Sequence, residues 1–436
     1  MLLNDGDAAG SLARIGPDQL VTSDVGIMRK MLAVRSTYRR SDWYVGMRLD
    51  PSRDNVLSER DDDRHNELRA KMAAGYAGRE NDHLEQAIDN NVANLIRLID
   101  AKYISNSTEY KPVDFGRKAQ YFTLDVISDI AFGSAFGYLD TDSDVYDYIK
   151  TTERTLPAII MITTLPWLNP LLQSSLLKLI LPSPEDQIGM GMLMGVAKAV
   201  VAERFGPNKK TQRDMLGSFV HHGLTQDEAE SETLVQILAG SDTTATAIRT
   251  ILLYIITAPR VCDRLLQEIS FAAPSSPISN AEARKMPYLQ AVIKEGLRIF
   301  PPVTGLMSKV VPPEGDTLNG DFIPGGTKVG YCAWGVFRDK KVWGEDSNVF
   351  RPERWLEGSG DEIREKELTW ELIFSYGRWQ CLGKNVALLE LNKVFVELLR
   401  HFEFAIVDPT NPWTSINCGV FMQYHMWLRV TRREGI

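Results

Sequence analysis

Residues 374–383 are FSYGRWQCLG, and a helical pattern from about Gly383 to His401 follows them directly. Cys381 therefore lies in a loop at a helix N-terminus. Unpaired backbone N–H groups and the positive end of the helix dipole favour a thiolate over a thiol there. A thiolate is the form that ligates a metal ion, so the segment indicates a metal-bound cysteine. A buried, inert cysteine is the alternative interpretation.

The residues around Cys381 favour the first interpretation. Gly377 and Gly383 let the backbone pass close to a flat ligand. Phe374 is placed to pack beside the sulfur and keep water away from it. The surroundings thus indicate a planar, apolar cofactor more than a structural thiol.

The composition is that of a globular protein with a large core. The chain has 436 residues, 44% of them hydrophobic, and a formal net charge of −8. A mildly acidic chain has no overall attraction for nucleic acid, so we expect no nucleic-acid partner. The chain has four cysteines but no CxxC pair, which argues against a disulfide framework and fits a reducing compartment. They are Cys262, Cys332, Cys381 and Cys418.

The first ten residues, MLLNDGDAAG, contain neither an apolar signal core nor a membrane-spanning run. The sequence from Arg14 to Pro17 already resembles folded structure. We therefore expect that the natural protein has an upstream segment, a membrane anchor, which precedes Met1.

Helical periodicity dominates the chain, and no Pro/Gly/Ser-rich linker divides it. We therefore predict a single domain, residues 1–436, mainly α with minor β. Ser23 or Asp24 is the expected N-cap of a helix that ends near Val34, and residues 35–62 are expected to be irregular. The predicted strands are 14–22 and Thr327–Cys332, and the other predicted helices are 64–77, 82–104, 116–134, 226–257, 259–271, 286–299 and 383–401.

The stretch from Leu156 to Leu181 is strongly apolar but is broken by Pro157, Pro166 and Pro170. Proline interrupts a helix, so this stretch does not form one membrane-spanning helix. Buried core is one interpretation. A substrate-entry lip that touches a membrane is the other.

Ala239-Gly240-Ser241-Asp242-Thr243-Thr244 falls in the middle of the predicted helix 226–257. Glycine there costs about 1 kcal/mol relative to alanine, and a threonine hydroxyl can bond back to the preceding turn and bend the helix. Such a defect suits a site where a small ligand lies against the helix. An ordinary buried, threonine-rich helix is the alternative.

Four motifs in this order resemble the cytochrome P-450 superfamily. They are AGSDTT at 239–244, EGLR at 295–298, FRPERW at 350–355, and the segment around Cys381, which matches the haem-binding pattern FxxGxxxCxG. The resemblance covers nearly the whole chain from about residue 14. The segments AGSDTTATAIRT and QCLGKNVALLELNK are most similar to fungal members related to pisatin demethylase.

The resemblance implies the cytochrome P-450 fold, with haem b between a long central helix and the loop that carries Cys381. The Cys381 thiolate would ligate the iron and assist O–O cleavage. Asp242 and Thr243 would deliver protons to oxygen. Glu295 and Arg298, which alone resemble an ordinary surface pair, would form a buried network with Arg354 that steadies the cysteine loop.

The resemblance also implies cations for the haem propionates. His65 and Arg69 are one turn apart on an early helix, although the family usually has tryptophan at the position of His65. Trp379 stands where the family usually has arginine or histidine, and Lys309 where arginine is frequent. We predict His65, Arg69 and Arg378 as propionate ligands, followed by Lys309; solvated surface charge is the alternative for each.

For the substrate pocket, the resemblance implies four segments: 43–47, 237–240, 303–307 and 418–421. Their apolar or small side chains indicate a hydrophobic or aromatic substrate, although core packing explains them equally well. The individual predicted substrate contacts are Trp43, Ile237, Ala239, Gly240, Val303, Leu306 and Phe421.

We therefore expect a haem-thiolate monooxygenase of fungal secondary metabolism or detoxification. Its electrons would come from NADPH through an NADPH–cytochrome reductase, because the chain has no GxGxxG dinucleotide motif of its own. The expected location is the cytoplasmic face of the endoplasmic reticulum membrane. The alternatives are a haem-thiolate isomerase or dehydratase, an oxidative coupling enzyme without net oxygen insertion, and a catalytically silent haem protein.

Overall fold

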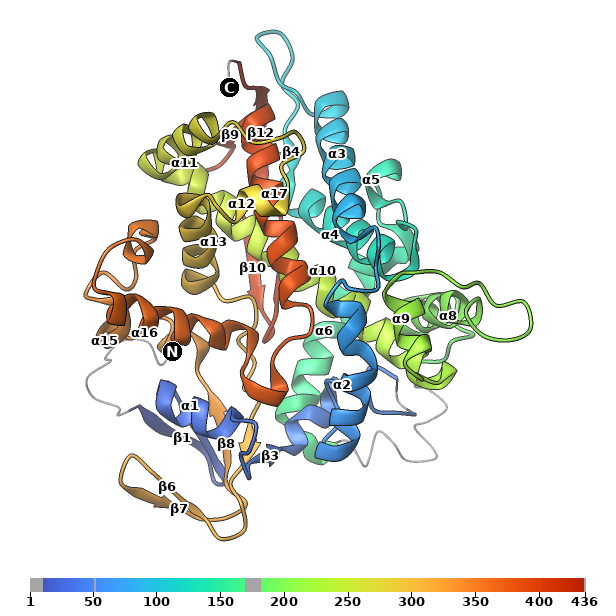
Figure 1. Cartoon of the computed structure of the whole chain (residues 1–436), viewed down its shortest axis with the longest axis vertical. Helices are drawn as coiled ribbons and strands as arrows, with labels where there is room; N and C mark the ends of the chain where they lie inside the picture. The colour runs from blue at the N-terminus through green and yellow to red at the C-terminus, as the bar shows by residue number, and fades with distance from the viewer. Residues whose placement is uncertain (1–10, 51, 169–181, 435–436) are drawn as a thin grey trace.

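The computed structural model describes residues 11–50, 52–168 and 182–434. Helices dominate and strands are few, which confirms the predicted fold class (Figure 1). The long predicted helices are present, with ends within two residues of the prediction. They are α2 (Asp62–Tyr76), α3 (Leu84–Lys102), α4 (Phe115–Phe132), α10 (Gln226–Thr257), α11 (Pro259–Ala272), α13 (Pro287–Ile299) and α17 (Lys384–His401).

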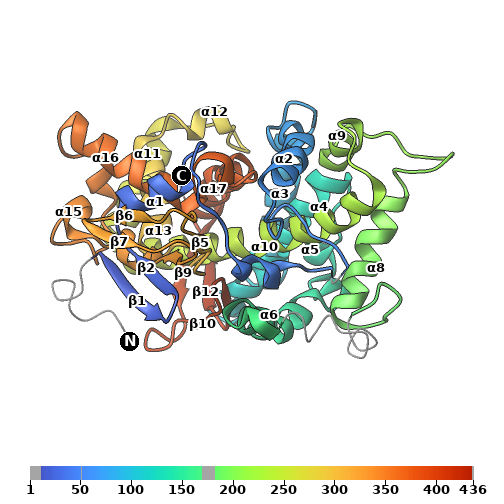
Figure 2. The ribbon, with the colours of Figure 1, turned by 90° about the horizontal axis from the view of Figure 1, so that it is seen from below.

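The helix α10 crosses the middle of the molecule (Figure 2). It begins with a capping box, in which Thr225 and Glu228 each accept a hydrogen bond from the other's backbone N–H. The helix continues without a break through residues 239–244, the segment where the sequence predicted a local defect. A Cβ at Gly240 would lie 2.8 Å from Ile127 Cδ1 of α4, so this glycine allows the two helices a close contact.

A five-stranded sheet forms much of the region at the bottom of Figure 1. The predicted single strand 14–22 is in fact a hairpin of β1 (Leu12–Gly16) and β2 (Gln19–Thr22), because Pro17 and Asp18 form a turn between them. The expected strand at 327–332 is β8 (Lys328–Tyr331), parallel to β2. The short strands β3 (Arg39–Arg40) and β5 (Lys309–Val310) complete this sheet, with Arg40 directly opposite Lys309.

The helix α1 (Val25–Leu32) begins as predicted, with the Asp24 carboxylate accepting from the Ile27 N–H at 3.0 Å. The segment expected to be irregular contains β3 and a 3-10 helix, η1 (Asp42–Met47). The apolar stretch that begins at Leu156 forms the end of α6 (Tyr148–Thr164), which contains Pro157, and a short 3-10 helix, η3 (Pro166–Leu168). The rest of this stretch, residues 169–181, lies outside the described part.

The remaining helices and strands are shorter. The helices are α5 (Tyr138–Thr141), α8 (Gly189–Ala202), α9 (Met215–His221), α12 (Asn280–Ala283), α14 (Ala333–Val336), α15 (Lys340–Trp343) and α16 (Gly360–Trp370). The strands are β4 (Val113–Asp114), β6 (Asp316–Leu318), β7 (Asp321–Ile323), β9 (Phe402–Ile406), β10 (Thr414–Asn417), β11 (Phe421–Tyr424) and β12 (Trp427–Arg432).

In the part of the chain that the structure describes, no single helix is both long and apolar enough to cross a membrane. The helices α10 and α11 pass that test only when they are taken together, and they are bent by 104° where they meet.

Candidate active site around Cys381

The loop before α17 is closed by its own backbone. Cys381 N–H donates to the Phe374 carbonyl at 2.7 Å. Ser375 and Gly377 have positive φ angles of 61° and 62°, a region that side chains disfavour. A Cβ at Gly377 would lie 2.4 Å from the Leu32 carbonyl oxygen at the end of α1. Packing against α1 thus requires a glycine at position 377, and its approach to a flat ligand stays a prediction.

The Cys381 side chain is accessible, although protein surrounds it. Burial raises the pKa of its thiol, while the backbone N–H groups of Gly383 and Lys384 and the Arg69 guanidinium act in the opposite direction. The N–H groups at the helix N-terminus thus favour the thiolate, as the sequence predicted, but burial of the thiol outweighs them. A bound metal cation at the sulfur would make the thiolate the favoured form. At Gly383, a Cβ would meet only Cys381 Sγ and Tyr76 at ordinary contact distance.

A cluster of buried cations surrounds Trp379, two residues before the cysteine. Lys309 Nζ lies 3.4 Å from the centre of a Trp379 ring, and the Arg40 guanidinium lies 4.3 Å from it. The His65 ring packs against the indole at 4.4 Å. The pairing of β3 with β5 places Arg40 beside Lys309, and α2 supplies His65. Three elements thus bring basic groups to one aromatic side chain.

These buried groups are short of acceptors. Within the described residues, one buried nitrogen in each of five side chains has no hydrogen-bond partner, and all of these except His65 Nδ1, whose role depends on the tautomer, are donors: Arg40 Nε, His65 Nδ1, Lys309 Nζ, Arg378 Nε and Trp379 Nε1. Unpaired buried donors are rare in folded proteins because each costs free energy. A ligand with two carboxylates would supply these acceptors and balance the charge. The residues present therefore fit a haem with its propionates.

The predicted propionate ligands differ in how free they are. Arg69 is half-buried and makes no hydrogen bond or ion pair with any described residue. Arg378 is largely committed elsewhere, because it binds Asp62 at 3.0 Å and the Ser36 carbonyl at 2.8 Å.

His65 does not carry the positive charge that the sequence suggested. Burial, followed by the charges of Arg40, Arg69 and Lys309, lowers the pKa of His65 to about 3, so His65 is neutral in the protein alone. Burial likewise lowers the pKa of Lys309 well below its usual range. Sequence reasoning missed Arg40. Its strand has two residues and therefore no periodicity that marks it.

Asp242 and Thr243 point to different partners. The Thr243 hydroxyl donates to the Ala239 carbonyl at 2.8 Å, the back-bonding expected for this helix. The Asp242 carboxylate instead accepts from Gln120 of α4 and, at 3.2 Å, from the Tyr148 hydroxyl of α6. Burial raises the pKa of Asp242 to about 6, against the opposing effects of Arg249, Tyr148 and Gln120. Its side chain therefore titrates near neutral pH.

Glu295, Arg298 and Arg354 meet in the core. Both Glu295 oxygens bind Arg298, at 2.8 Å each, and Arg354 Nε lies 2.9 Å from Glu295 Oε1. All three side chains are 0% exposed. The Trp355 indole also donates to Glu295, and its ring contacts Trp370. Trp370 in turn packs on Phe374, so aromatic contacts connect this cluster to the cysteine loop.

The family profile described as Cytochrome P450 matches residues 21–424. The chain belongs to the cytochrome P450 family.

The relatives of this P450 are fungal. It is 47% identical to "Cytochrome P450 monooxygenase ABA1" of Pyricularia oryzae over 432 residues, 97% of this chain and 84% of that protein. It is 40% identical to aba1 of Botryotinia fuckeliana, over 98% of this chain and 85% of the relative. It is 38% identical to abl1 of Leptosphaeria maculans, over 92% of this chain and 73% of the relative. These findings confirm the predicted superfamily and make the protein a haem-containing oxidoreductase of the monooxygenase type.

Several predicted substrate-contact residues of the P450 lie close together. A Cβ at Gly305 would lie 3.1 Å from the Trp43 ring, and Val303 pairs with Val420 beside Phe421. Ala239 is exposed in the middle of a mostly buried helix, so it faces accessible space. Trp43, Ile237 and Phe421 are buried, and Val303, Leu306 and Gly240 are half-buried. A Cβ at Gly240 would lie 2.8 Å from Ile127 of α4, and a contact of the Gly240 backbone with substrate stays a prediction.

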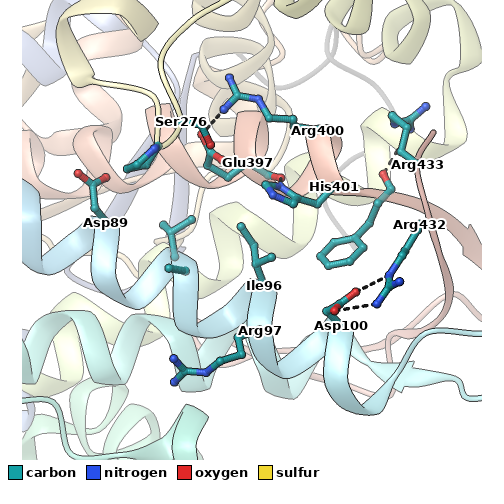
Figure 3. Close-up of a pocket in the computed structure, with 14 residues that line it drawn as sticks. Asp89, Ile96, Arg97, Asp100, Ser276, Glu397, Arg400, His401, Arg432 and Arg433 are labelled. Atoms are coloured by element: carbon teal, nitrogen blue, oxygen red, sulfur yellow. Dashed lines mark hydrogen bonds and ion pairs between the residues drawn. The ribbon is translucent and has the colours of Figure 1, made fainter. Parts of the chain in front are cut away.

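A separate pocket of about 600 Å³ lies between α3 and the C-terminal end of α17 (Figure 3). Two pairs of its charged side chains bind each other: Arg432 binds Asp100 at 2.7 and 2.9 Å, and Arg400 binds Glu397 at 3.1 Å. Glu397, the first residue of α17 that lines this pocket, is 13 residues after Lys384, so the pocket lies about 20 Å along the helix from the cysteine loop. It is therefore not the site of the P450 chemistry.

Proposed function

We propose that this P450 inserts one atom of molecular oxygen into a hydrophobic or aromatic small molecule. The observation that carries the proposal is an accessible cysteine at the N-terminus of α17, beside a buried cation cluster whose N–H donors lack acceptors. Haem bound through a thiolate supplies oxygen activation. Cys381 would hold its iron, and Arg40, Lys309, Arg69 and neutral His65 would bind its propionates, with Arg378 in a lesser role.

The network of Glu295, Arg298 and Arg354 has a supporting role in this proposal. Its charges are fully buried and paired with one another, so they are not free to bind substrate. Through Trp355, Trp370 and Phe374 it would hold the cysteine loop in the geometry that ligation needs. Gly377 would contribute by allowing the loop to pack against α1.

Asp242 and Thr243 are the proposed proton-handling pair. Thr243 carries a hydroxyl in the accessible part of α10, where it can orient water or substrate. Asp242, with its raised pKa, both gains and loses a proton near neutral pH, which general acid–base chemistry requires. Electrons would come from NADPH through a partner reductase.

The proposed substrate contacts are Trp43, Ile237, Ala239, Val303, Leu306 and Phe421. Phe421 packs against Phe300 at 4.6 Å and Trp334 at 6.2 Å, so the wall that it contributes is aromatic. Such a wall favours apolar or aromatic substrates. The fungal relatives support a place in secondary metabolism or detoxification.

We also propose contact with the endoplasmic reticulum membrane through the region that follows Leu156. Trp167 is 68% exposed, and Met161 and Leu165 are exposed near it in sequence. Exposed tryptophan and aliphatic side chains bind membrane interfaces. Flotation with liposomes tests this: Trp167→Ser combined with Met161→Ser should reduce the floated fraction. An equal floated fraction for the variant and the parent protein would contradict the proposed contact.

The Thr243→Val substitution tests the proposed function. It keeps the shape of the side chain and removes the hydroxyl, so haem binding and the thiolate spectrum should survive. With added reductase, NADPH consumption should continue, while product formed per NADPH falls and hydrogen peroxide rises. General acid–base groups typically contribute about 100- to 10,000-fold to a rate, which is the upper limit for the loss of product formation. The loss should be smaller than this, because bound water can replace part of the role of the hydroxyl.

Unchanged coupling in the Thr243→Val protein would remove Thr243 from the mechanism. It would also favour an isomerase, dehydratase or coupling enzyme without net oxygen insertion. Substrate-dependent consumption of NADPH and oxygen by the parent protein separates the monooxygenase from those alternatives and from a silent haem protein.

A further inference from the structure

The two oxygens of the Asp242 carboxylate have different kinds of partner. Oδ1 accepts from the Gln120 side-chain amide, and Oδ2 faces the Tyr148 hydroxyl at 3.2 Å. Arg249 Nη2 donates to Gln120 Oε1 at 2.9 Å. A guanidinium has only donors, so the amide oxygen must face Arg249 and the amide N–H₂ must face Asp242. Oδ1 therefore always meets a donor and is not the oxygen that takes up a proton.

The Tyr148 hydroxyl lies between two acceptors. It is 3.2 Å from Asp242 Oδ2 and 3.1 Å from Ser241 Oγ. The Ser241 hydroxyl hydrogen is already used, because it donates to the Ile237 carbonyl at 2.8 Å. Toward Tyr148, Ser241 is therefore only an acceptor. The single phenolic hydrogen can satisfy one of these two oxygens at a time.

We propose that Tyr148 and Ser241 are positioning residues that let Asp242 hold a proton on Oδ2 without losing a hydrogen bond. When the carboxylate is ionised, the phenolic hydrogen points to Oδ2. When Oδ2 takes a proton from water, the new O–H donates to the tyrosine oxygen, and the phenolic hydrogen turns to Ser241 Oγ. Loss of the proton reverses both steps. One proton is gained or lost, and no other bond changes.

This inference rests on the proposed role of Asp242 as a proton carrier and adds the device that serves it. The charged groups that act on the carboxyl are Arg249 on α10, which favours the ionised form, and Glu153 on α6, which disfavours it. The nearby phenol of Tyr138 on α5 stays protonated, since burial raises its pKa. Burial of the carboxyl opposes Arg249, and a balance between the two forms is the condition that a reversible carrier needs.

The direct measurement is an infrared titration of the purified haem protein. The carboxylic C=O band that disappears in Asp242→Asn identifies the protonated side chain, and its amplitude against pH gives the midpoint. Neither substrate nor reductase is needed. In the parent protein the midpoint should lie at about 6.

Two substitutions should move this midpoint in opposite directions. Ser241→Ala removes the acceptor used only in the protonated state, so the midpoint should fall by about half a pH unit. Gln120→Met removes a donor to the ionised state, so the midpoint should rise by about one unit. In a Tyr148→Phe background, Ser241→Ala should have no effect, because the link between the two residues is gone. Thr250→Val serves as the control, since Thr250 is a buried hydroxyl on the same helix without a hydrogen-bond partner in the described residues.

A merely structural Ser241 would leave the midpoint unchanged, and that result overturns the inference. An upward shift, or an equal shift in the Tyr148→Phe background, also overturns it. Ser241→Ala is a small change in the core, and the ferrous–CO spectrum checks that each variant is folded. If Gln120→Met does not fold, the comparison of Ser241→Ala in the parent protein and in the Tyr148→Phe background still tests the inference. Failure of the proposed function is a different observation, namely an unchanged ratio of product to NADPH in Asp242→Asn.

Discussion

Two clusters of buried charge in this P450 are built in opposite ways. Around Glu295, each carboxylate oxygen is bound to an arginine, and the Trp355 indole adds a further donor. Around Trp379, the side chains of Arg40, Lys309 and His65 are gathered without an acidic hydrogen-bond partner, and one buried nitrogen in each of five side chains lacks a hydrogen-bond partner among the described residues. The first cluster is complete within the protein. The second is completed only by an anionic ligand. Both clusters are buried and charged, so what distinguishes a structural cluster from a binding site is whether its polar groups already have hydrogen-bond partners within the protein.

The largest expected effect comes from Cys381→Ser. The variant should lose entirely the red-shifted ferrous–CO band that thiolate ligation gives, because serine supplies no thiolate. A CO-difference spectrum measures this, with Cys262→Ser on α11 as the control that keeps the band. Survival of the band in the Cys381 variant would show that another residue ligates the iron.

The cluster around Glu295 should lose stability when the charge of Glu295 is removed. Glu295→Gln leaves Arg298 buried without a counter-charge and leaves Arg354 with only the partly exposed Asp346 at 3.0 Å, which typically costs about 3–5 kcal/mol of the free energy of unfolding. Urea unfolding measures the loss. A change below about 1 kcal/mol would mean that the backbone carbonyl acceptors and Asp346 balance the two arginines.

Two lysines, each 1% exposed, differ in the same way as the two clusters. Lys393 binds Asp89 at 2.6 Å and Glu85 at 2.8 Å, whereas Lys309 Nζ has no hydrogen-bond partner among the described residues. Lys393→Met should therefore lower the stability of the haem-free protein by about 2 kcal/mol, and Lys309→Met should raise it by about as much.

Haem binding should separate the same two variants. Lys309→Met should weaken haem affinity about tenfold, because a charge-assisted hydrogen bond is lost, and Lys393→Met should leave it unchanged. Calorimetric unfolding of the haem-free proteins and haem titration give the two readouts. Destabilisation by Lys309→Met without loss of haem affinity would assign Lys309 to the scaffold.

The smallest expected effect is a pH dependence at His65. The pKa of His65 is about 3 in the folded protein and about 6.5 in an unfolded chain, so the unfolded state binds more protons between these values. The stability of the haem-free protein should therefore decrease as the pH falls below 6.5. The His65 contribution is about 1 kcal/mol between pH 6.5 and pH 5.5.

His65→Gln should remove that part of the pH dependence in urea unfolding. The same substitution at exposed His425 is the control. Bound propionates should raise the pKa of His65, so the haem-loaded protein should show a smaller dependence. An identical pH profile for parent and His65→Gln proteins would contradict the cause assigned here.

The sequence was most informative where a local pattern determines local structure. Helical periodicity located α2, α3, α4, α10 and α17 to within two residues, and the order of the motifs indicated Cys381. It was least informative where partners are distant in sequence. Arg40 meets Lys309 through two strands of two residues each, too short for any period. Arg378 is paired with Asp62, 316 positions away, so no local rule predicts that its charge is already used.

The close contact between α4 and α10 at Gly240 has a consequence for how this enzyme changes over evolution. The same two helices carry Gln120 and Asp242, so a side chain that pushes them apart at position 240 also displaces the carboxylate that we propose as the proton carrier. Mutations on this part of α10 would change substrate preference and catalytic efficiency together. Adaptation to new substrates is therefore expected to accumulate in the segments at 43–47, 303–307 and 418–421, which carry none of the groups that hold Asp242.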